Sequence, residues 1–300
     1  MTPLPPLRLR DRTIDVPRGR PLIMGIVNAG PDSFSDAVRL RTLDDQVAHA
    51  CRLVADGADL IDVGGESGVT YTPVTAPAVE IARVIPLVER LAAEGVAVSV
   101  DTWKPAVARA ALDAGAVMIN DTSGLEDLGL AEACAATGAA LVVMHTRAAP
   151  KQERFADYGG DVVGDVVAFL AERCAAARAA GVGDDQLVLD PGPDFAKTPQ
   201  ETVAVLRAID RVAALGRPLL LAVSRKYFVG AITGRHPAGR LAGTLAAVGW
   251  AADAGAAIVR VHDVAETADF LRVRSVLAGD AEVPVFDTDD EALKWIRAGR

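Results

Sequence analysis

Eight short apolar segments recur along this chain, and each is followed by a stretch long enough to form a helix. The segments are rich in Val, Ile and Leu without clean alternation, which is typical of parallel strands buried on both faces. This repeat constrains the fold most, because consecutive parallel strands need a crossover connection that is usually a helix. The predicted strands are residues 22–28, 59–63, 96–101, 116–120, 140–144, 186–190, 218–223 and 256–261.

The connecting stretches have the apolar spacing of helices, most clearly over residues 43–55, 77–93 and 105–114. Most of them end at a glycine, the residue that favours the left-handed backbone of a helix C-terminus. The sequence therefore predicts an α/β fold, a single (β/α)8 TIM barrel. A doubly wound open sheet is the alternative, because a strand pattern does not show whether the sheet closes. The glycines are Gly57, Gly95, Gly115, Gly138, Gly181, Gly216 and Gly255.

The two ends of the chain fall outside this repeat. Residues 1–20 are expected to form an N-terminal hairpin segment, with arms at 7–10 and 13–16 that could plug the bottom of the barrel. The barrel is expected over residues 21–278. Residues 279–300 are expected to form a C-terminal extension made of a loop and a short helix.

Composition excludes several classes of protein. The 300 residues are 51% hydrophobic, and the formal net charge of -9 argues against nucleic acids and anionic membranes as partners. Cys51, Cys134 and Cys174 are dispersed within helical patterns, which indicates reduced thiols, and no Cys or His pair has zinc-ligand spacing. Without a secretory signal or a membrane-length apolar run, the protein is expected to be soluble and cytoplasmic.

Polar residues stand at the C-terminal ends of the predicted strands. In a β/α barrel these ends form one face, on which such barrels build their active sites. Residues from most of the sequence would therefore converge on one pocket. They are Asn28, Asp62, Asp101, Asn120, Asp121, His145, Asp190, Ser224, Arg225, Lys226, Arg260 and His262.

Some of these residues could hold a flat heterocycle. Asp101, Asn120 and Asp190 come from different strands, and their oxygens and amide can pair with the donor and acceptor edge of a ring. Lys226 adds a cation and a donor beside them. Each strand-end Asp also has a purely structural interpretation, because Asp is a favoured helix N-cap.

A basic cluster ends the last two strands, where barrels often bind phosphate. A solvated surface charge is the alternative for Arg225 and Arg260. A core or capping role is the alternative for His262. The cluster comprises Ser224, Arg225, Lys226, Arg260 and His262.

Nine short motifs together resemble the dihydropteroate synthase family, in that family's order and over about residues 22–275. The resemblance implies a β/α barrel that joins 6-hydroxymethyl-7,8-dihydropterin pyrophosphate to 4-aminobenzoate, releasing pyrophosphate and forming 7,8-dihydropteroate in folate biosynthesis. The motifs are short singly but specific jointly. They are Met24–Asn28, Pro31–Asp36, Asp62–Ser67, Asp101–Thr102, Ile119–Asp121, Val143–His145, Leu189–Gly192, Ser224–Lys226 and Arg260–Asp263.

The resemblance assigns the pterin pocket to residues from several strands. Asp101, Asn120 and Asp190 would hydrogen-bond the pterin ring. Lys226 would lie on the far side of the ring, and Met144 would pack beneath it.

The resemblance also implies where the diphosphate and the amine bind. Arg260 and His262 would hold the diphosphate, and Asn28 would help to place a Mg²⁺ ion bound to it. The aminobenzoate side would be lined by Ser224, Arg225 and Phe195. Neutralising the diphosphate would favour C–O cleavage, and buried carboxylates would stabilise the pterin cation that the amine attacks. The catalytic set would then be Asp101, Lys226, Arg260 and His262.

The chain departs from the family pattern in its loops. In the first loop, Ala29–Gly30 replaces Val-Thr and Ala37–Val38 replaces a glycine pair. In the second, Gly68–Val69 replaces a Thr and an Arg that would contact aminobenzoate and diphosphate, so a weaker acceptor site and poor sulfonamide binding are expected. Pro193–Asp194 stands where a small residue and Gly are usual, and this extra carboxylate is expected to repel an anionic acceptor.

Three functions are compatible with these features. The first is a working dihydropteroate synthase, a transferase with unusual loops. The second is a non-catalytic or repurposed pterin-binding paralogue, which the altered second loop favours. The third is a pterin-dependent methyltransferase, which would share the Asp and Asn residues but would not need the basic cluster.

One helix is expected to need a partner. The segment after Pro237 runs through Leu241, Leu245, Val248 and Trp250, with small residues on its other faces. Such a helix on the outside of a barrel exposes apolar surface. We therefore expect a homodimer, as the family resemblance also suggests.

Overall fold

The computed structural model describes residues 6–10, 12–16, 19–30, 42–66, 73–152 and 154–284. Four of the sequence features above lie outside the described residues. They are Pro31–Asp36, Ala37–Val38, Gly68–Val69 and the end of the C-terminal extension after residue 284.

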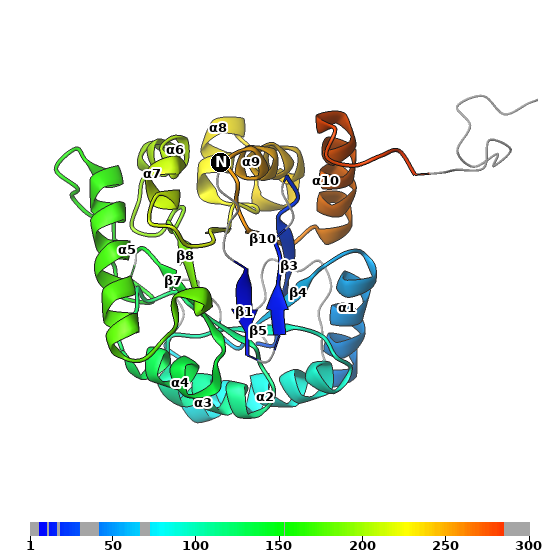
Figure 1. The fold of residues 1–300 in the computed structure, drawn as a ribbon, viewed down its shortest axis with the longest axis vertical. Coiled ribbons are helices and arrows are strands. Elements are labelled where there is room, and N and C mark those ends of the chain that lie inside the picture. Colours follow the sequence, from blue (N-terminus) through cyan, green and yellow to red (C-terminus); the bar gives the residue numbers. More distant parts are fainter. Residues whose placement is uncertain are drawn as a thin grey trace, which may run out of the picture.

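Within this described part, eight parallel strands form the centre of the molecule (Figure 1). Their order is β8-β7-β6-β5-β4-β3-β10-β9. A parallel bridge pairs Leu189 with Leu219, and the Leu189 N–H donates to the Pro218 carbonyl at 2.9 Å. The sheet therefore closes into a barrel, and the open-sheet alternative is wrong. The strands are β3 (Leu22–Asn28), β4 (Leu60–Gly64), β5 (Val98–Asp101), β6 (Met118–Asp121), β7 (Ala140–Met144), β8 (Leu187–Asp190), β9 (Leu220–Leu221) and β10 (Ile258–Val261).

Helices surround the strands on the outside (Figure 1). The first begins as its sequence predicts, because Thr42 and Asp45 form a reciprocal capping box. Gly138 follows the fourth with a φ of 75°, the left-handed conformation expected of it. The helices are α1 (Leu43–Ala55), α2 (Pro77–Ala93), α3 (Pro105–Asp113), α4 (Gly129–Thr137), α5 (Val162–Ala179), α6 (Pro199–Arg207), α7 (Ile209–Ala213), α8 (Tyr227–Thr233), α9 (Leu241–Asp253) and α10 (Val264–Ala278).

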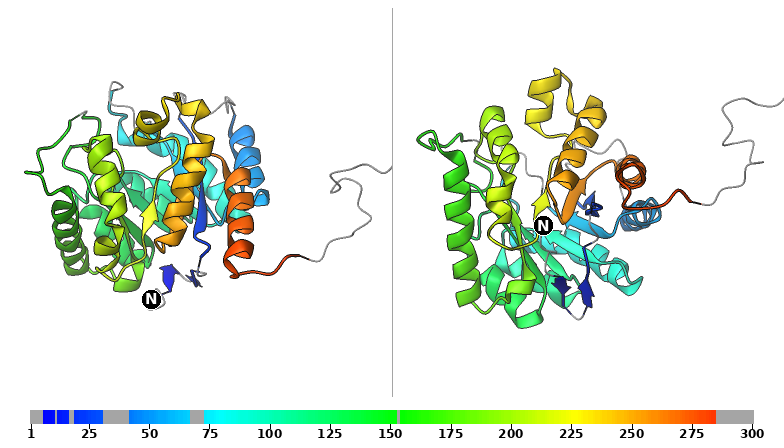
Figure 2. Two further views of the ribbon diagram at one scale, coloured as in Figure 1. Left: turned by 90° about the horizontal axis from the view of Figure 1, so that it is seen from above. Right: turned by 45° about the horizontal axis from the view of Figure 1, so that its top comes forward.

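The hairpin at the N-terminus closes one end of the barrel (Figure 2). Strands β1 (Leu7–Leu9) and β2 (Arg12–Ile14) pair antiparallel. Leu7 and Leu9 are fully buried and belong to one apolar cluster with Met24 of β3 and residues of the other strands. The predicted plug is therefore confirmed.

Strand register places the polar strand ends side by side. Asp101 pairs with Gly64 on one neighbouring strand and with Asn120 on the other. Met144 pairs with Asp190 on β8. Since all strands are parallel, these residues share the C-terminal face of the barrel.

Two expectations from composition can be compared with the described chain. Its helices include none with the length and apolar character needed to cross a membrane. Cys51, Cys134 and Cys174 are all free, which confirms that they do not form a disulfide frame.

Candidate active site

Polar side chains from distant parts of the sequence form one network at the mouth of the barrel. Arg260 Nε donates to Asp62 Oδ2 at 2.6 Å, and Arg260 Nη2 donates to Asp101 Oδ2 at 2.9 Å. Asn120 Nδ2 donates to the same Asp62 oxygen at 3.1 Å. The structure thus joins residues expected at the pterin with the arginine expected at the diphosphate.

Asp62 is central to this network, and sequence reasoning assigned it no role in the site. Its side chain is fully buried, and its Oδ1 has no hydrogen-bond partner among the described residues. A buried carboxylate oxygen without a donor is costly. The signal was present, because Asp62 was noted as a strand-end residue, but its contact with Arg260 depends on the pairing of both β4 and β10 with β3.

Burial changes the protonation of the site. It raises the pKa of Asp101 to about 7, although the Arg260 guanidinium opposes the shift. Burial also raises the pKa of Asp190 and lowers the pKa of Lys226. A ligand that pairs with these groups would therefore favour their charged forms.

Two residues expected on the aminobenzoate side, Phe195 and Ser224, each contact a residue expected at the pterin or the diphosphate. Lys226 Nζ lies 4.4 Å from the centre of the Phe195 ring, a cation–π contact. Ser224 Oγ lies 3.0 Å from His262 Nδ1 and accepts the His262 backbone N–H at 3.2 Å. A cavity of about 540 Å³ adjoins Phe195 and Lys226, with Trp103 on its wall.

The Arg225 guanidinium pairs with Asp263, the second residue after β10. Its Nε and Nη2 donate to the two oxygens of Asp263, at 3.1 and 2.5 Å. Its backbone has a φ of 56°, and its N–H donates to Thr244 Oγ1 at 3.0 Å. The guanidinium therefore forms a bidentate pair, and its role in lining the acceptor site stays a prediction.

Three further expected residues lie on the same face. Asp190 is buried, and its Oδ1 accepts the Gly192 N–H at 2.7 Å. Met144, its neighbour in register, is also buried. Asn28 ends β3 opposite Gly64 of β4.

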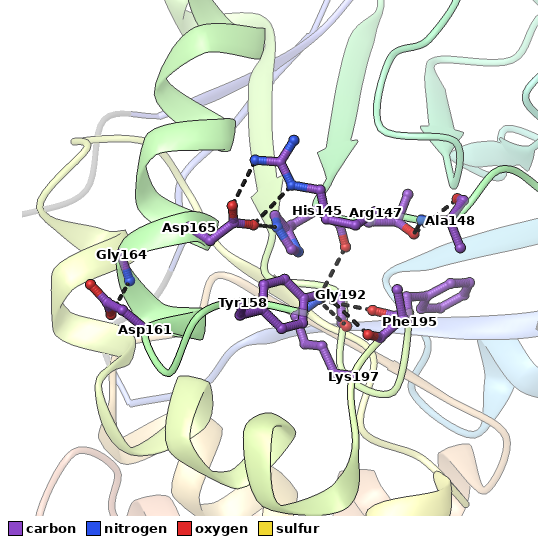
Figure 3. A network of polar contacts seen from close by, with 12 residues as sticks. His145, Arg147, Ala148, Tyr158, Asp161, Gly164, Asp165, Gly192, Phe195 and Lys197 are labelled. Atoms are coloured by element: carbon purple, nitrogen blue, oxygen red, sulfur yellow. Dashed lines mark hydrogen bonds and ion pairs between the residues drawn. The ribbon is translucent and has the colours of Figure 1, made fainter. Parts of the chain in front are cut away.

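Other strand-end residues have structural roles. Asp121 accepts the backbone N–H groups of Ser123 and Leu125 at 2.8 and 2.5 Å, so it stabilises the loop after β6. His145 is buried, and its Nε2 lies 2.8 Å from Asp165 Oδ2 on α5. Burial lowers the pKa of His145 to about 3, so the imidazole is neutral. Figure 3 shows the Asp165 carboxylate in contact with both His145 and Arg147.

Lys197 is a second residue that sequence reasoning missed. It is buried, and its Nζ donates to the carbonyls of Gly192, Phe195 and His145 at 3.0, 3.1 and 3.3 Å (Figure 3). These bonds hold the loop after β8 against the end of β7. No sequence signal marks this role, because a loop lysine is usually exposed.

A buried ionic cluster supports the rim of the barrel. Lys104 Nζ pairs with the carboxylates of Glu66 and Glu80 and donates to the Thr75 carbonyl at 2.7 Å. Glu66 Oε1 accepts the Thr75 N–H at 2.9 Å and lies 3.5 Å from Lys151 Nζ. The cluster joins the segments that follow β4, β5 and β7.

Comparisons with known proteins agree with this geometry. A family model described as pterin binding enzyme matches residues 24–262. The dihydropteroate synthase of Mycobacterium leprae is 42% identical over 259 residues, covering 84% of this chain and 91% of the relative.

Solved structures extend the similarity to the fold. A Xanthomonas albilineans dihydropteroate synthase with 4-aminobenzoic acid has a TM-score of 0.84 and 42% identity, covering 94% of this chain and 100% of that one. A Burkholderia cenocepacia dihydropteroate synthase complexed with 7,8-dihydropteroate also has a TM-score of 0.84 and 42% identity, with 93% and 99% covered. With its barrel, its strand-end network and these relatives, the chain belongs to the pterin-binding enzyme family, among the dihydropteroate synthases.

Proposed function

We propose that this protein condenses 6-hydroxymethyl-7,8-dihydropterin pyrophosphate with 4-aminobenzoate to form 7,8-dihydropteroate and pyrophosphate. The observation that carries the proposal is the network of Asp62, Asp101, Asn120 and Arg260 at the barrel mouth. It places hydrogen-bonding groups for a heterocycle next to a cation for a diphosphate, as this reaction requires.

Charge complementarity gives the mechanism. The C–O bond of the pterin methylene breaks, and its electron pair leaves with the diphosphate, whose charge Arg260, Lys226 and His262 would neutralise. The carboxylates of Asp101 and Asp190 would stabilise the pterin cation. The amine nitrogen then forms the C–N bond and loses a proton, and little acid–base catalysis is needed because an aromatic amine is unprotonated near neutral pH.

We propose that a magnesium ion binds beside Asn28. Asn28 offers an amide oxygen, the hard donor that Mg²⁺ prefers. Asn28 Oδ1 faces Gly64 of the neighbouring strand, where a Cβ would lie 3.7 Å away, in ordinary van der Waals contact. No cluster of three or more His, Cys, Asp or Glu that could hold a metal is present in the described chain. Asn28 would therefore hold the ion together with substrate phosphates, and bound Mg²⁺ would supply further neutralisation of the leaving group.

A second copy of this chain is the proposed protein partner. Helices α6, α8 and α9 form an apolar groove of about 350 Å³. Ile232 is 68% exposed and Trp250 is 49% exposed, and apolar patches of this kind are typical of protein interfaces. We propose that this face forms the homodimer contact. The groove includes Val203, Leu206, Phe228, Val229, Ile232, Ala246, Ala247 and Trp250.

Three finer expectations remain proposals. The division into segments 1–20, 21–278 and 279–300 is one. Weak sulfonamide binding, which would follow from Gly68–Val69, is another. A cytoplasmic location is the third.

Product formation and complementation test the function. The purified chain with both substrates and Mg²⁺ should form 7,8-dihydropteroate and release pyrophosphate in equal amounts, and the gene should restore growth of a strain lacking the synthase. Arg272→Gln, an exposed change on α10, serves as the control that should keep activity. Pterin binding without product would support a non-catalytic pterin-binding paralogue. Methyl transfer from a methylated pterin would support a pterin-dependent methyltransferase.

A further inference from the structure

The loop that follows β8 is linked to the start of α8 by a carboxylate that the proposed chemistry does not use. Asp194 Oδ2 accepts the Tyr227 N–H at 2.5 Å, and both Asp194 oxygens lie 3.3 Å from the Phe228 nitrogen. Thr202 Oγ1 of α6 accepts the Asp194 N–H at 3.0 Å. The side chain thus satisfies N–H groups in the first turn of α8, which have no carbonyl partner within the helix.

Both ends of this link lie next to residues of the expected aminobenzoate side. Phe195 directly follows Asp194, and Lys226 directly precedes Tyr227. The Phe195 ring and the Lys226 ammonium are 4.4 Å apart. Asp194 and Tyr227 are each adjacent in sequence to one partner of this contact. The hydrogen bond between them therefore limits how far the Phe195 ring and the Lys226 ammonium can move apart.

The backbone around Phe195 is held in an unusual conformation. Asp194 and Ala196 have φ values of 67° and 55°, a left-handed region that residues with side chains rarely adopt. Such strain persists only where the surroundings enforce it. On the far side of Phe195, Lys197 donates to three carbonyl groups (Figure 3). Phe195 therefore lies between two polar anchors, Asp194 and Lys197.

Asp194 also balances the charge of Lys226. Burial lowers the pKa of Lys226, and the nearby Asp194 carboxylate is the largest opposing influence. Asp190 and Asp101 also oppose this shift, so the Lys226 ammonium keeps acidic neighbours when the charge of Asp194 is removed.

We propose that Asp194 is a positioning residue of the aryl-amine site. By holding the first turn of α8, it keeps Phe195 against Lys226 and so increases affinity for 4-aminobenzoate. This replaces the repulsion expected from the sequence, because the carboxylate accepts the N–H groups of Tyr227 and Phe228. The inference rests on the proposed synthase function and deepens it. The Asp62–Arg260 network is not part of this link, so pterin binding should change less than amine binding.

Two variants at this position separate hydrogen bonding from charge and strain. Asp194→Gly removes the carboxylate but accepts a positive φ without strain. Asp194→Asn keeps a side-chain oxygen for the Tyr227 N–H and tolerates the left-handed backbone, but removes the charge. Asp161→Gly is the control, because Asp161 also accepts a first-turn N–H group of a helix, α5, with its Oδ1 2.8 Å from the Gly164 nitrogen (Figure 3).

Steady-state kinetics with each substrate varied should distinguish the variants. Loss of a helix-capping bond changes an equilibrium by about two- to thirtyfold. Asp194→Gly should therefore raise the KM for 4-aminobenzoate about fivefold or more and the KM for the pterin substrate less than about twofold. Asp194→Asn should stay within about twofold of the wild type for both substrates. Amide hydrogen exchange at Tyr227 and Phe228 should accelerate in the glycine variant only.

Three results would overturn the proposal. They are an unchanged amine KM in Asp194→Gly, an Asn variant as impaired as the Gly variant, and equal increases in both KM values accompanied by a lower Tm. Asp161→Gly should lower Tm without changing the amine KM. If the wild type shows no turnover, calorimetric titration with 4-aminobenzoate measures its affinity for the amine directly. Amine binding without product in the wild type would refute the synthase function alone, and no amine binding would refute both.

Discussion

Replacing Asp62 with Asn should disconnect the barrel-mouth network while preserving its shape. Asp62 Oδ2 accepts from both Arg260 and Asn120, and the side chain is fully buried. The substitution removes the charge that faces Arg260. Among the described residues, that guanidinium then keeps an ion pair with Asp101, whose side chain is 23% exposed.

The magnitude follows from the lost contact. A hydrogen bond to a charged group contributes about 1.5–3 kcal/mol, so the free energy of unfolding should fall by about that amount. Asp62→Ala also leaves Asn120 without its acceptor and should cost about 3–5 kcal/mol. Because Arg260 and Asn120 lose their fixed positions, the Kd for the pterin substrate should rise about tenfold in Asp62→Asn, which corresponds to about 1.4 kcal/mol.

Urea unfolding measures the first effect, and calorimetric titration of the pterin substrate measures the second. Asp121→Asn is the matched control, since Asp121 is an equally buried strand-end carboxylate whose hydrogen bonds in the described part of the chain are to Ser123 and Leu125 of its own loop. It should lower stability and leave pterin affinity unchanged. The reasoning is refuted if Asp62→Asn binds pterin as the wild type does, or if Asp121→Asn weakens binding equally.

Four further changes test other parts of the site. Asp190→Ala should weaken pterin binding by about 2–4 kcal/mol, because a buried charged acceptor is lost, and unchanged affinity in calorimetry would show that the pocket is misplaced. The pKa of Asp101 is raised to about 7, so its carboxylate forms only as pH rises through that value. The kcat/KM for the pterin substrate should therefore rise about tenfold from about pH 6 to about pH 8. The same pH profile in Asp101→Asn would contradict this. Replacing Gly68 with Thr and Val69 with Arg together should lower the KM for 4-aminobenzoate by about one to two powers of ten and strengthen sulfonamide inhibition. A wild-type KM in the range usual for such enzymes would show that the altered second loop does not weaken the acceptor site. Ile232→Glu should convert the dimer to a monomer in sedimentation at micromolar concentration, and a monomeric wild type would exclude the dimer.

Much of the fold could be predicted because its signals are local. The boundaries of α1 and α2 follow from apolar spacing, and the Thr42–Asp45 capping box needs only four consecutive residues. Left-handed glycines such as Gly138 mark where helices end. Strand-end placement of Asp101 and Asn120 follows from the same periodicity, since each strand carries its polar residue at its own C-terminal end.

The tertiary structure alone decided which strand-end residues meet. Both the last strand, β10, and the second, β4, pair with β3, and this strand order brings Arg260 to Asp62. Asp62 and Asp121 look alike in sequence, yet one contacts a distant arginine and the other its own loop.

In the loops too, the contacts of Asp194 and Lys197 could not be predicted from the sequence. In the sequence, Asp194 is an extra carboxylate and Lys197 a loop cation, and nothing nearby indicates their partners. Their hydrogen bonds reach the start of α8 and the end of β7, 33 and 52 residues away along the chain. The sequence by itself determined the strands, the helices and the set of polar strand ends, because these depend on neighbouring residues. The pairing of those polar groups depends on register, closure and loop path, which only the folded chain specifies.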